Sequence, residues 1–309
     1  MKYKPKLPLL CNKKPKHPFY KLKNIPLRPV MHQNTLFARL AVIGLLLVLL
    51  ITSCDPYQKL LKSTNYDLKY AKAKEYYNKG NYSQASPLLE ELMTVWRGSR
   101  DVEKIYYFYA YCYYGSGDYL LSANYFKNFT NYYPKSAYAE DALYMSGYSF
   151  YKMSPKPSLD ATDTRKAIDA LQLFINTYPS STKVTACNDL IDELRGKLET
   201  KAFEGAYLYY RMRNYKAAST SLKAILRDYP DTPKREEVMF LIVKSYYLLA
   251  QNSIESKRKE RYQAASEAYI EFIDKFPQSE YRREAERLYS SALEFVKTID
   301  QKQKATSNE

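Results

Sequence analysis

The residues best suited to catalysis are scarce in this chain, and their positions favour other roles. Both histidines, His17 and His32, precede Cys54, so the chain beyond Cys54 lacks the usual general base and the commonest zinc ligand. Cys112 and Cys187 fall in separate helical patterns, too far apart in the expected fold to form a disulfide, and we expect both to be small buried core residues. We therefore expect a protein that is not an enzyme and that needs no metal ion and no cofactor.

Tyrosine is the residue type with the most unusual usage, because the chain has 34 tyrosines in 309 residues. Several recur at spacings of three, four and seven, which places them on one stripe of a helix. The positions that we call the tyrosine stripe are Tyr107, Tyr111, Tyr114, Tyr144, Tyr148, Tyr151, Tyr207, Tyr210, Phe240 and Tyr247. One interpretation is a groove that binds an extended peptide by its aromatic side chains, while the hydroxyls bond its backbone. The alternative is that these rings are additional core between repeated units.

Cys54 is the cysteine for which the sequence predicts a covalent role. Arg39 precedes an apolar run from Leu40 to Ile51, which is twelve residues long, whereas a membrane span needs roughly 20. A short apolar run after a basic residue, ending in small residues, is typical of a secretory signal. The ending I-T-S-C at positions 51–54 resembles the lipobox of bacterial lipoproteins, which implies a cysteine that carries acyl chains such as palmitate and becomes the new N-terminus. The alternative is an uncleaved anchor with a coincidental cysteine.

The charge of the chain is concentrated in the segment that such a signal removes. Ten of the 48 basic residues precede Cys54 and none of the 33 acidic residues does, so the remainder has 38 basic and 33 acidic residues and a net charge of +5. The basic balance therefore does not indicate a nucleic-acid partner. Residues 1–30, with nine basic residues and no acidic one, are expected to be disordered, and translation from Met31 would give a signal of ordinary length.

Beyond the signal, one skeleton recurs along the chain. An aromatic residue is followed three positions later by a small residue, then by an apolar residue, and an aromatic-proline pair closes the unit twelve positions after the small residue. The closing pairs are Tyr133-Pro134, Tyr178-Pro179, Tyr229-Pro230 and Phe276-Pro277. An earlier copy ends at Trp96 without the proline, and the five small residues are Ala85, Ser122, Ala167, Ala218 and Ala265. A recurrence every 37 to 51 residues predicts a stacked helical solenoid.

The skeleton describes the second helix of a helical hairpin. Its small and apolar positions share one helix face, and the proline ends the helix. The residues two positions after each proline are expected N-caps of the next helices: Ser136, Ser181, Thr232 and Ser279. The first helices carry a small-aromatic-Gly-Tyr spacing, as in Ala110, Tyr113, Gly117 and Tyr119, although Arg213 stands where one copy should have the glycine. These features resemble the tetratricopeptide repeat.

The expected fold is thus all-α, a tetratricopeptide-repeat solenoid of about five helical hairpins plus a C-terminal capping helix. We expect a basic extension and signal over residues 1–53, a lipidated tether over 54–65, the solenoid over 66–298 and a disordered tail over 299–309. An unbroken pattern from Lys183 to Met212 predicts one long helix or two helices with a kink. The Pro-rich stretch 153–163 and the charged stretch S-K-R-K-E-R at 256–261 are expected to be loops.

The whole arrangement resembles the BamD family of tetratricopeptide-repeat lipoproteins, from Cys54 to about Lys297. The lipobox, the five repeats, the Tyr-Pro hairpin ends, the long helix and the run L-R-D-Y-P-D-T at 226–232 carry this resemblance. It implies a lipid-anchored scaffold on the periplasmic face of the outer membrane, within the β-barrel assembly machinery. Such a scaffold would bind the periplasmic domains of a BamA-like subunit through its C-terminal repeats and the C-terminal segments of unfolded outer-membrane proteins through its N-terminal repeats.

Three alternatives remain open at this point. A periplasmic repeat protein that coordinates envelope constriction or peptidoglycan assembly would share the hairpins but usually lacks a lipobox. A carbohydrate-binding lipoprotein would need a further domain, and an envelope enzyme would need catalytic residues that the chain beyond Cys54 does not offer. The sorting of the lipoprotein is also open, because Asp55 follows the lipid-bearing cysteine and an acid there retains lipoproteins in the inner membrane of enteric bacteria.

Overall fold

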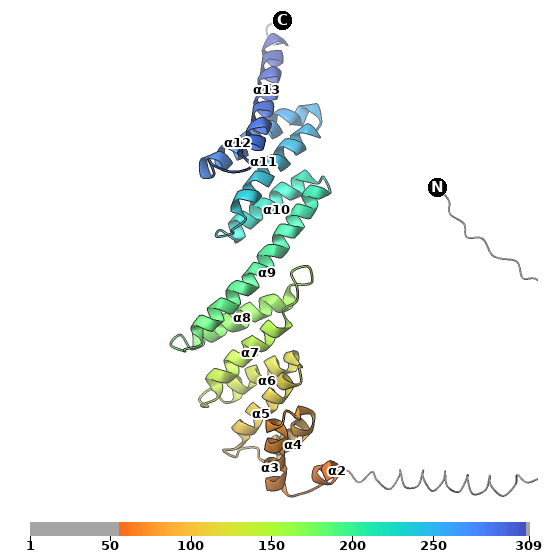
Figure 1. Ribbon diagram of the computed structural model, residues 1–309, viewed down its shortest axis with the longest axis vertical. Coiled ribbons are helices and arrows are strands. Elements are labelled where there is room, and N and C mark those ends of the chain that lie inside the picture. Colours follow the sequence, from red (N-terminus) through yellow and green to blue (C-terminus); the bar gives the residue numbers. More distant parts are fainter. Residues whose placement is uncertain (1–55, 307–309) are drawn as a thin grey trace, which may run out of the picture. The chain divides into compact units, whose positions relative to one another are not determined.

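The computed structural model describes residues 56–306, and all the regular secondary structure in that range is α-helical (Figure 1). The twelve helices are α2 (Pro56–Leu61), α3 (Tyr66–Asn78), α4 (Tyr82–Val95), α5 (Val102–Gly115), α6 (Tyr119–Tyr132), α7 (Ala139–Met153), α8 (Thr162–Thr177), α9 (Val184–Arg211), α10 (Tyr215–Asp228), α11 (Arg235–Gln251), α12 (Glu255–Lys275) and α13 (Arg282–Thr306). The chain divides into two units, residues 1–62 and 63–309. Of the helices within residues 56–306, α2 belongs to the first unit and the others to the second.

Within the second unit, helices that follow one another in sequence pack against one another (Figure 1). They form five hairpins, namely α3 with α4, α5 with α6, α7 with α8, α9 with α10, and α11 with α12. The final helix α13 packs on α12 and more lightly on α11. The predicted all-α solenoid of about five helical hairpins plus a C-terminal helix is therefore confirmed.

The repeated skeleton supplies the core of each hairpin. Its five small residues, from Ala85 to Ala265, are between 0% and 3% exposed, so there is room at these positions only for a small side chain. The bulky residues seven positions later are equally buried, at 2% exposure or less, and they are Leu92, Phe129, Phe174, Ile225 and Phe272. Small and bulky positions together make the second helix of each hairpin a packing element rather than a surface element.

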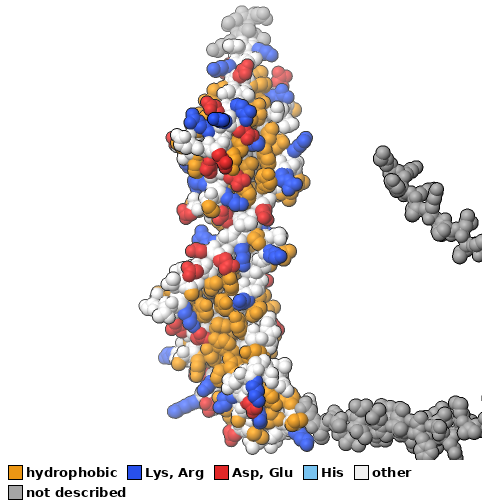
Figure 2. Space-filling model, viewed as in Figure 1, with side chains coloured by type: hydrophobic (Ala, Val, Ile, Leu, Met, Phe, Trp, Pro, Cys, Tyr) orange, Lys and Arg blue, Asp and Glu red, His pale blue; other side chains and the backbone are white. Residues whose placement is uncertain are grey.

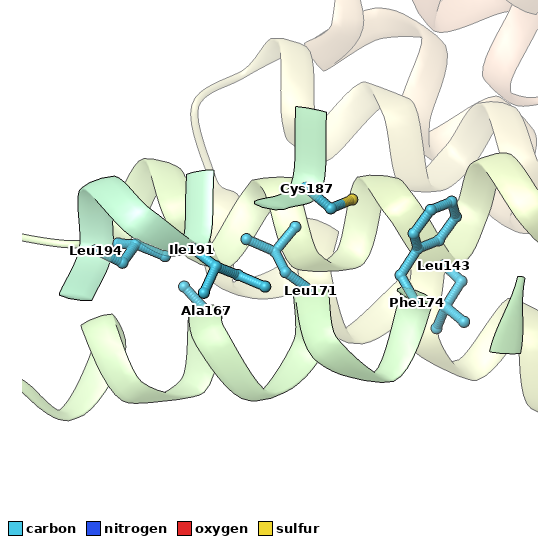
Figure 3. Close-up of a cluster of buried hydrophobic side chains, with 7 residues drawn as sticks. All are labelled: Leu143, Ala167, Leu171, Phe174, Cys187, Ile191 and Leu194. Atoms are coloured by element: carbon cyan, nitrogen blue, oxygen red, sulfur yellow. The ribbon is translucent and has the colours of Figure 1, made fainter. Parts of the chain in front are cut away.

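The third hairpin and the start of α9 share the core cluster drawn in Figure 3. Leu171 and Phe174 of α8 lie between Leu143 of α7 and the first turns of α9, from which Cys187 points into the cluster (Figure 3). Cys187 and Cys112 are both free and buried, as predicted. Burial raises the pKa of the Cys187 thiol to about 11 and that of Cys112 to about 12, so both stay protonated and unreactive at neutral pH.

The turns inside the hairpins explain the recurrent glycine of the first helices. Gly117, with φ of 80°, ends α5 in the left-handed conformation that favours glycine. Arg213 occupies the same place after α9 with φ of 60°, the one non-glycine residue with positive φ in the described part of the chain. Its N–H donates to the carbonyl of Tyr210 at 3.0 Å, and the Asn214 N–H donates to that of Tyr209 at 2.9 Å. The turn is thus kept at the cost of local backbone strain.

The aromatic residues before the prolines end the second helices. Each is the C-cap of its helix, and its N–H donates to the carbonyl four residues earlier at 2.8–2.9 Å. The four residues, half-buried at the edges of core clusters, are Tyr133, Tyr178, Tyr229 and Phe276. They are therefore less enclosed than the core positions of the same helices.

The hydroxyl residues predicted as N-caps accept backbone N–H groups in the turns that precede the first helices of the hairpins and α13, not at the helix starts. Ser181 is an example, because its Oγ accepts the N–H of Lys183 at 3.1 Å while α9 begins only at Val184. The prediction was wrong in detail: each hydroxyl closes a turn three residues before its helix begins. Two of these hydroxyls also donate to glutamates of the preceding first helix, Ser181 to Glu140 at 2.6 Å and Thr232 to Glu199 at 2.5 Å.

Several element boundaries differ from those expected. The charged stretch 256–261 is helical and forms the start of α12, and α13 continues through Thr306 into the segment expected as a tail. The expected tether contains the short helix α2, and the long pattern before Met212 forms the single 28-residue helix α9 rather than two helices. The Pro-rich stretch remains a connection between α7 and α8, although its Ala161 is buried.

Candidate functional site

The first six residues of the tyrosine stripe lie together on α5 and α7. All six are half-buried, and their rings form one continuous group. On α7 the rings of Tyr144, Tyr148 and Tyr151 are stacked, with centroids 5.8 and 5.6 Å apart and interplanar angles of 12° and 19°. Tyr114 of α5 joins them, 6.2 Å from Tyr148. The structure thus brings together the rings that the helical spacing placed on one face, and it leaves part of each ring exposed.

Asp141, in the first turn of α7, binds three side chains around this group. Its Oδ2 accepts the hydroxyls of Tyr107 at 2.6 Å and Tyr111 at 2.7 Å, and its Oδ1 pairs with the Lys183 ammonium ahead of α9. The Lys183 ammonium also lies 4.7 Å from the centre of the Tyr144 ring. One carboxylate therefore links the second, third and fourth hairpins.

The electrostatics of this cluster follow from burial and hydrogen bonding. Burial is the largest influence on Asp141 and acts to raise its pKa, but the hydrogen bonds from Lys183, Tyr107 and Tyr111 outweigh it and hold the pKa below its ordinary value. Burial first, and their hydrogen bonds second, raise the pKa of both tyrosines above the ordinary range. At neutral pH the cluster therefore contains an ionised carboxylate that accepts two protonated phenols.

A second carboxylate occupies the far end of the same stripe. The Tyr151 hydroxyl donates to Glu193 of α9 at 2.7 Å, and Glu193 also pairs with Lys197 at 3.2 Å. The bond to Glu193 raises the pKa of Tyr151 to about 12, and the bond from Tyr151 lowers that of Glu193. Lys197 in turn lies 5.4 Å from the Tyr151 ring. Three of the six hydroxyls are thus already bonded to carboxylates of the protein.

The C-terminal part of the stripe is less uniform. Tyr207 is 39% exposed and stacks between Phe203, at 6.1 Å, and Tyr210, at 6.0 Å. Tyr210 is half-buried, as is Tyr247 of α11, whose ring meets that of Tyr262 edge to face at 5.4 Å. These rings extend the stripe only as two separate groups, one on α9 and one between α11 and α12.

Phe240 does not lie on the surface expected for the stripe. It is 4% exposed, and its ring stacks on Tyr281 at 4.6 Å with an interplanar angle of 8°. The prediction that Phe240 lines a groove is corrected on this point, because α13 follows the fifth hairpin and the chain just ahead of it covers the ring. Phe240 belongs to the core cluster shared by α11, α12 and α13.

The polar partners of the stripe are the residues that the sequence reasoning missed. Asp141 stands three residues before Tyr144, in phase with the stripe, and this spacing was the available signal. Tyr138, which stacks on Tyr107 at 4.6 Å, had no such signal because it lies in the turn before α7.

Figure 2 shows hydrophobic side chains gathered over the level of α6 to α8 on the face in view.

Comparison with known proteins bears on the family of the chain. The model of the YfiO family, described as "Outer membrane lipoprotein", matches residues 63–261 and again residues 196–295. The chain belongs to the YfiO family of outer membrane lipoproteins. Among curated relatives, a protein of Aquifex aeolicus (strain VF5) named "Putative outer membrane protein assembly factor BamD" is 25% identical over 206 residues, which cover 66% of this chain and 67% of that protein.

A second curated relative and one solved structure complete the comparison. The outer membrane protein assembly factor BamD of Caulobacter vibrioides is 22% identical over 192 residues, 62% of this chain and 63% of that protein. The chain thus spans about two thirds of the length of each of these two relatives. The TPR2AB domain of yeast Sti1, solved in complex with pHSP90, is similar at 16% identity with a TM-score of 0.36, over 74% of this chain and 98% of that one.

Two further observations concern membranes and metals. No helix within residues 56–306 has both the length and the apolar character that crossing a membrane requires. In the same part of the chain, no group of three or more His, Cys, Asp or Glu side chains is placed to hold a metal ion. The predicted basic extension and signal, Cys54 and Asp55 lie outside the described residues.

Proposed function

We propose that this chain is a lipid-anchored scaffold on the periplasmic face of the outer membrane that serves the assembly of β-barrel proteins, and that it is not an enzyme. The observation that carries the proposal is the match of the outer membrane lipoprotein family to residues 63–295, which cover the helical solenoid almost completely. Two relatives named as assembly factors support it. A stack of helical hairpins presents an extended side-chain surface, as a scaffold requires.

The anchor in this proposal is Cys54. A thioether-linked diacylglycerol with a further acyl chain, such as palmitate, would give stable attachment because anchoring needs more than one chain. Residues after Cys54 would then tether the solenoid at the membrane surface. Placement in the outer rather than the inner membrane is part of the proposal, and Asp55 makes it a point to test.

The proposed partners are of two kinds. The C-terminal repeats would bind the periplasmic domains of a BamA-like barrel-assembly subunit, and the N-terminal repeats would bind C-terminal segments of unfolded outer-membrane proteins. Such segments alternate apolar and polar residues and are rich in aromatics. The stacked rings of α7, with the neighbouring rings of α5, offer a rigid amphipathic surface of the type that anchors aromatic side chains.

The hydrogen bonds of the stripe refine this part of the proposal. Because Tyr107, Tyr111 and Tyr151 already donate their hydroxyl protons to carboxylates, these hydroxyls are not available as donors to the carbonyl groups of a bound peptide. Contact through the ring faces is better supported. Tyr148 is the central ring of the α7 stack and therefore the most informative position.

Peptide binding tests the site directly. The affinity of a C-terminal barrel-protein peptide, measured by fluorescence anisotropy, is expected to fall at least about tenfold in Tyr148→Ala, which corresponds to about 1.4 kcal/mol. Tyr148→Phe should bind like the wild type if the ring carries the contact. Tyr132→Ala removes a tyrosine that is 66% exposed and off the stripe, and it is the matched control. Unchanged affinity in Tyr148→Ala, or loss only together with unfolding, would leave these rings as core.

Co-purification tests the wider proposal. The lipidated protein, extracted from envelopes in detergent, is expected to bring with it a barrel-assembly subunit. Recovery of division or peptidoglycan proteins instead would favour the alternative of a periplasmic repeat protein that coordinates envelope constriction. Fractionation of the same envelopes would show whether the protein resides in the inner or the outer membrane despite Asp55.

A further inference from the structure

Helix α9 is the structural link between two groups of helices. Cys187, Ile191 and Leu194, in its first half, pack in the cluster with α7 and α8 (Figure 3). Phe203 and Ala206, in its second half, pack with α10 and α11. We call α3–α8 the N-terminal block and α10–α13 the C-terminal block. Among the described helices, α9 packs extensively on both α8 and α10, and no other helix packs extensively on both blocks.

The middle of α9 is the part that neither core encloses. Between the buried Leu194 and Phe203, none of the residues is buried. A helix that is packed on one side at each end, with a less covered centre, resists bending mainly through its own backbone hydrogen bonds. The backbone composition of this centre therefore decides how stiff the link is.

Two glycines bracket the centre of α9, Gly196 and Gly205. Both are exposed, and a Cβ added to either would meet no atom within 4 Å. No packing contact therefore requires glycine at these positions, although each costs the helix roughly 1 kcal/mol relative to alanine. This contrasts with Gly147 of α7, where an added Cβ would lie 2.9 Å from the Leu171 side chain. The α9 glycines lower the stiffness of the helix without serving close approach.

A cleft lies over the same segment, with walls from both blocks. Its volume is about 430 Å³, and its floor includes Leu198 and Gly205 of α9. Arg165, in the first turns of α8, is its one lining residue from the N-terminal block, whereas Asp228 and Tyr229, at the end of α10, are among those from the C-terminal block. A bend of α9 between the two glycines changes the distance between Arg165 and the α10 residues that line this cleft, because they belong to different blocks.

Polar contacts from both blocks reach the centre of α9. The Lys201 ammonium donates to the backbone carbonyl of Leu159 at 2.6 Å, in the connection between α7 and α8. Glu199 accepts the hydroxyl of Thr232 at 2.5 Å, from the turn before α11. The Lys201 ammonium also donates to the carbonyl of Pro157 at 3.4 Å, and that of Lys197 donates to the hydroxyl of Ser154 at 3.5 Å. Such bonds, made by side chains at partly exposed sites, are worth about 1 kcal/mol each and can break and reform. They limit the range of bending rather than prevent it.

We propose that α9 is a hinge at Gly196 and Gly205 about which the two blocks change their relative angle, opening and closing the cleft between Arg165 and Asp228. The hinge is a property of this chain's own helix and does not depend on the proposed function. A scaffold with such a hinge adjusts the spacing between partners bound to its two blocks.

Distance distributions by double electron–electron resonance test the hinge. Spin labels at Asp169→Cys on α8 and Thr220→Cys on α10 report on the two blocks, in a full chain with Cys11 and Cys54 changed to serine. The buried thiols of Cys112 and Cys187 remain unlabelled because burial raises their pKa. Wild type is expected to give a broad distribution, and Gly196→Ala, which lies outside the cleft lining, is expected to narrow it. Gly196→Ala/Gly205→Ala should narrow it further.

Two controls separate the hinge from general stabilisation. Thr185→Ala raises helix propensity at an exposed position of α9 that lies before the glycines, and it should leave the distribution unchanged. A label pair at Asn131→Cys and Asp169→Cys, both in the N-terminal block, should be narrow in every variant. An interblock distribution that is already narrow in wild type, or that narrows equally in Thr185→Ala, would overturn the hinge.

Discussion

Asp141 gives the sharpest test of how the repeats are joined at the stripe. The change Asp141→Asn keeps the shape of the side chain but removes the charge that faces Lys183 and that accepts the hydroxyls of Tyr107 and Tyr111. The Lys183 pair is about one third exposed, so it is worth at most about 1 kcal/mol. The two phenol bonds to an ionised carboxylate are stronger than neutral ones, and an amide oxygen replaces them only in part, at a cost of about 1 kcal/mol.

We therefore expect Asp141→Asn to lower the free energy of unfolding by about 2 kcal/mol at pH 7, measured by urea denaturation with an unchanged slope. The pKa of Asp141 is held below its ordinary value of 3.8, so its contribution is complete above that value and is lost as pH falls through the folded-state pKa. The difference between wild type and variant should consequently shrink as the pH is taken below 3.8.

A matched control uses an exposed pair of the same chemistry. Asp163 pairs with Lys166 at 3.2 Å on the surface of α8, so Asp163→Asn should cost no more than about 0.5 kcal/mol. If Asp141→Asn behaves like this control, or if its effect is as large at low pH as at pH 7, the carboxylate does not join the hairpins as argued.

Three further predictions concern the anchor, the hairpin ends and the strained turn. Cys54→Ala should leave an unprocessed or soluble precursor with the same helical circular dichroism, whereas a processed membrane protein would show that the cysteine is not the anchor. Tyr178→Ala should cost roughly 2 kcal/mol in urea denaturation, less than for an enclosed ring, because Tyr178 is only half-buried beside Phe174; a loss well under 1 kcal/mol would remove it from the core. Arg213→Gly should stabilise the protein by about 0.5–1 kcal/mol because φ of 60° suits glycine, and a lower melting temperature than wild type would contradict this.

The fold was predictable because its signals are local and redundant. The small residue, the bulky residue and the proline each constrain the same helix, and the structure places all five small positions in the core. The predicted boundary of the helix that begins at Glu255 was wrong because a run of charged residues was interpreted as a loop. The stretch 256–261 is helical because its charges find partners, Lys257 with Glu260 and Lys259 with Asp300 of α13. The second of these partners is distant in sequence, so the charged stretch alone could not reveal it.

The stripe shows a similar division between local and distant information. Helical spacing was sufficient to place six tyrosines on one face of α5 and α7, because that depends only on position along a helix. Helical spacing could not predict which face of each helix is covered by the segment that follows in the chain. Phe240 has the same phase as its counterparts, yet the chain before α13 contributes Tyr281 and buries it. The protonation and bonding of the hydroxyls were equally out of reach, since Asp141 and Glu193 come from other helices than the tyrosines that they bind.

The tyrosine stripe is a continuous surface only in its N-terminal part, and this difference bears on how one solenoid could bind two kinds of partner. In the N-terminal block the rings form one continuous surface that hydrogen bonds to carboxylates hold in place, so its shape is set before any ligand arrives. Beyond the N-terminal block the equivalent positions are the exposed Tyr207 and the half-buried Tyr210 of α9, the half-buried Tyr247 of α11 and a buried core residue, Phe240. A site for aromatic segments is therefore better supported on α5 and α7 than beyond α9. A partner of the C-terminal block must recognise different chemistry, and a Tyr148→Ala variant that loses peptide binding should still retain that partner.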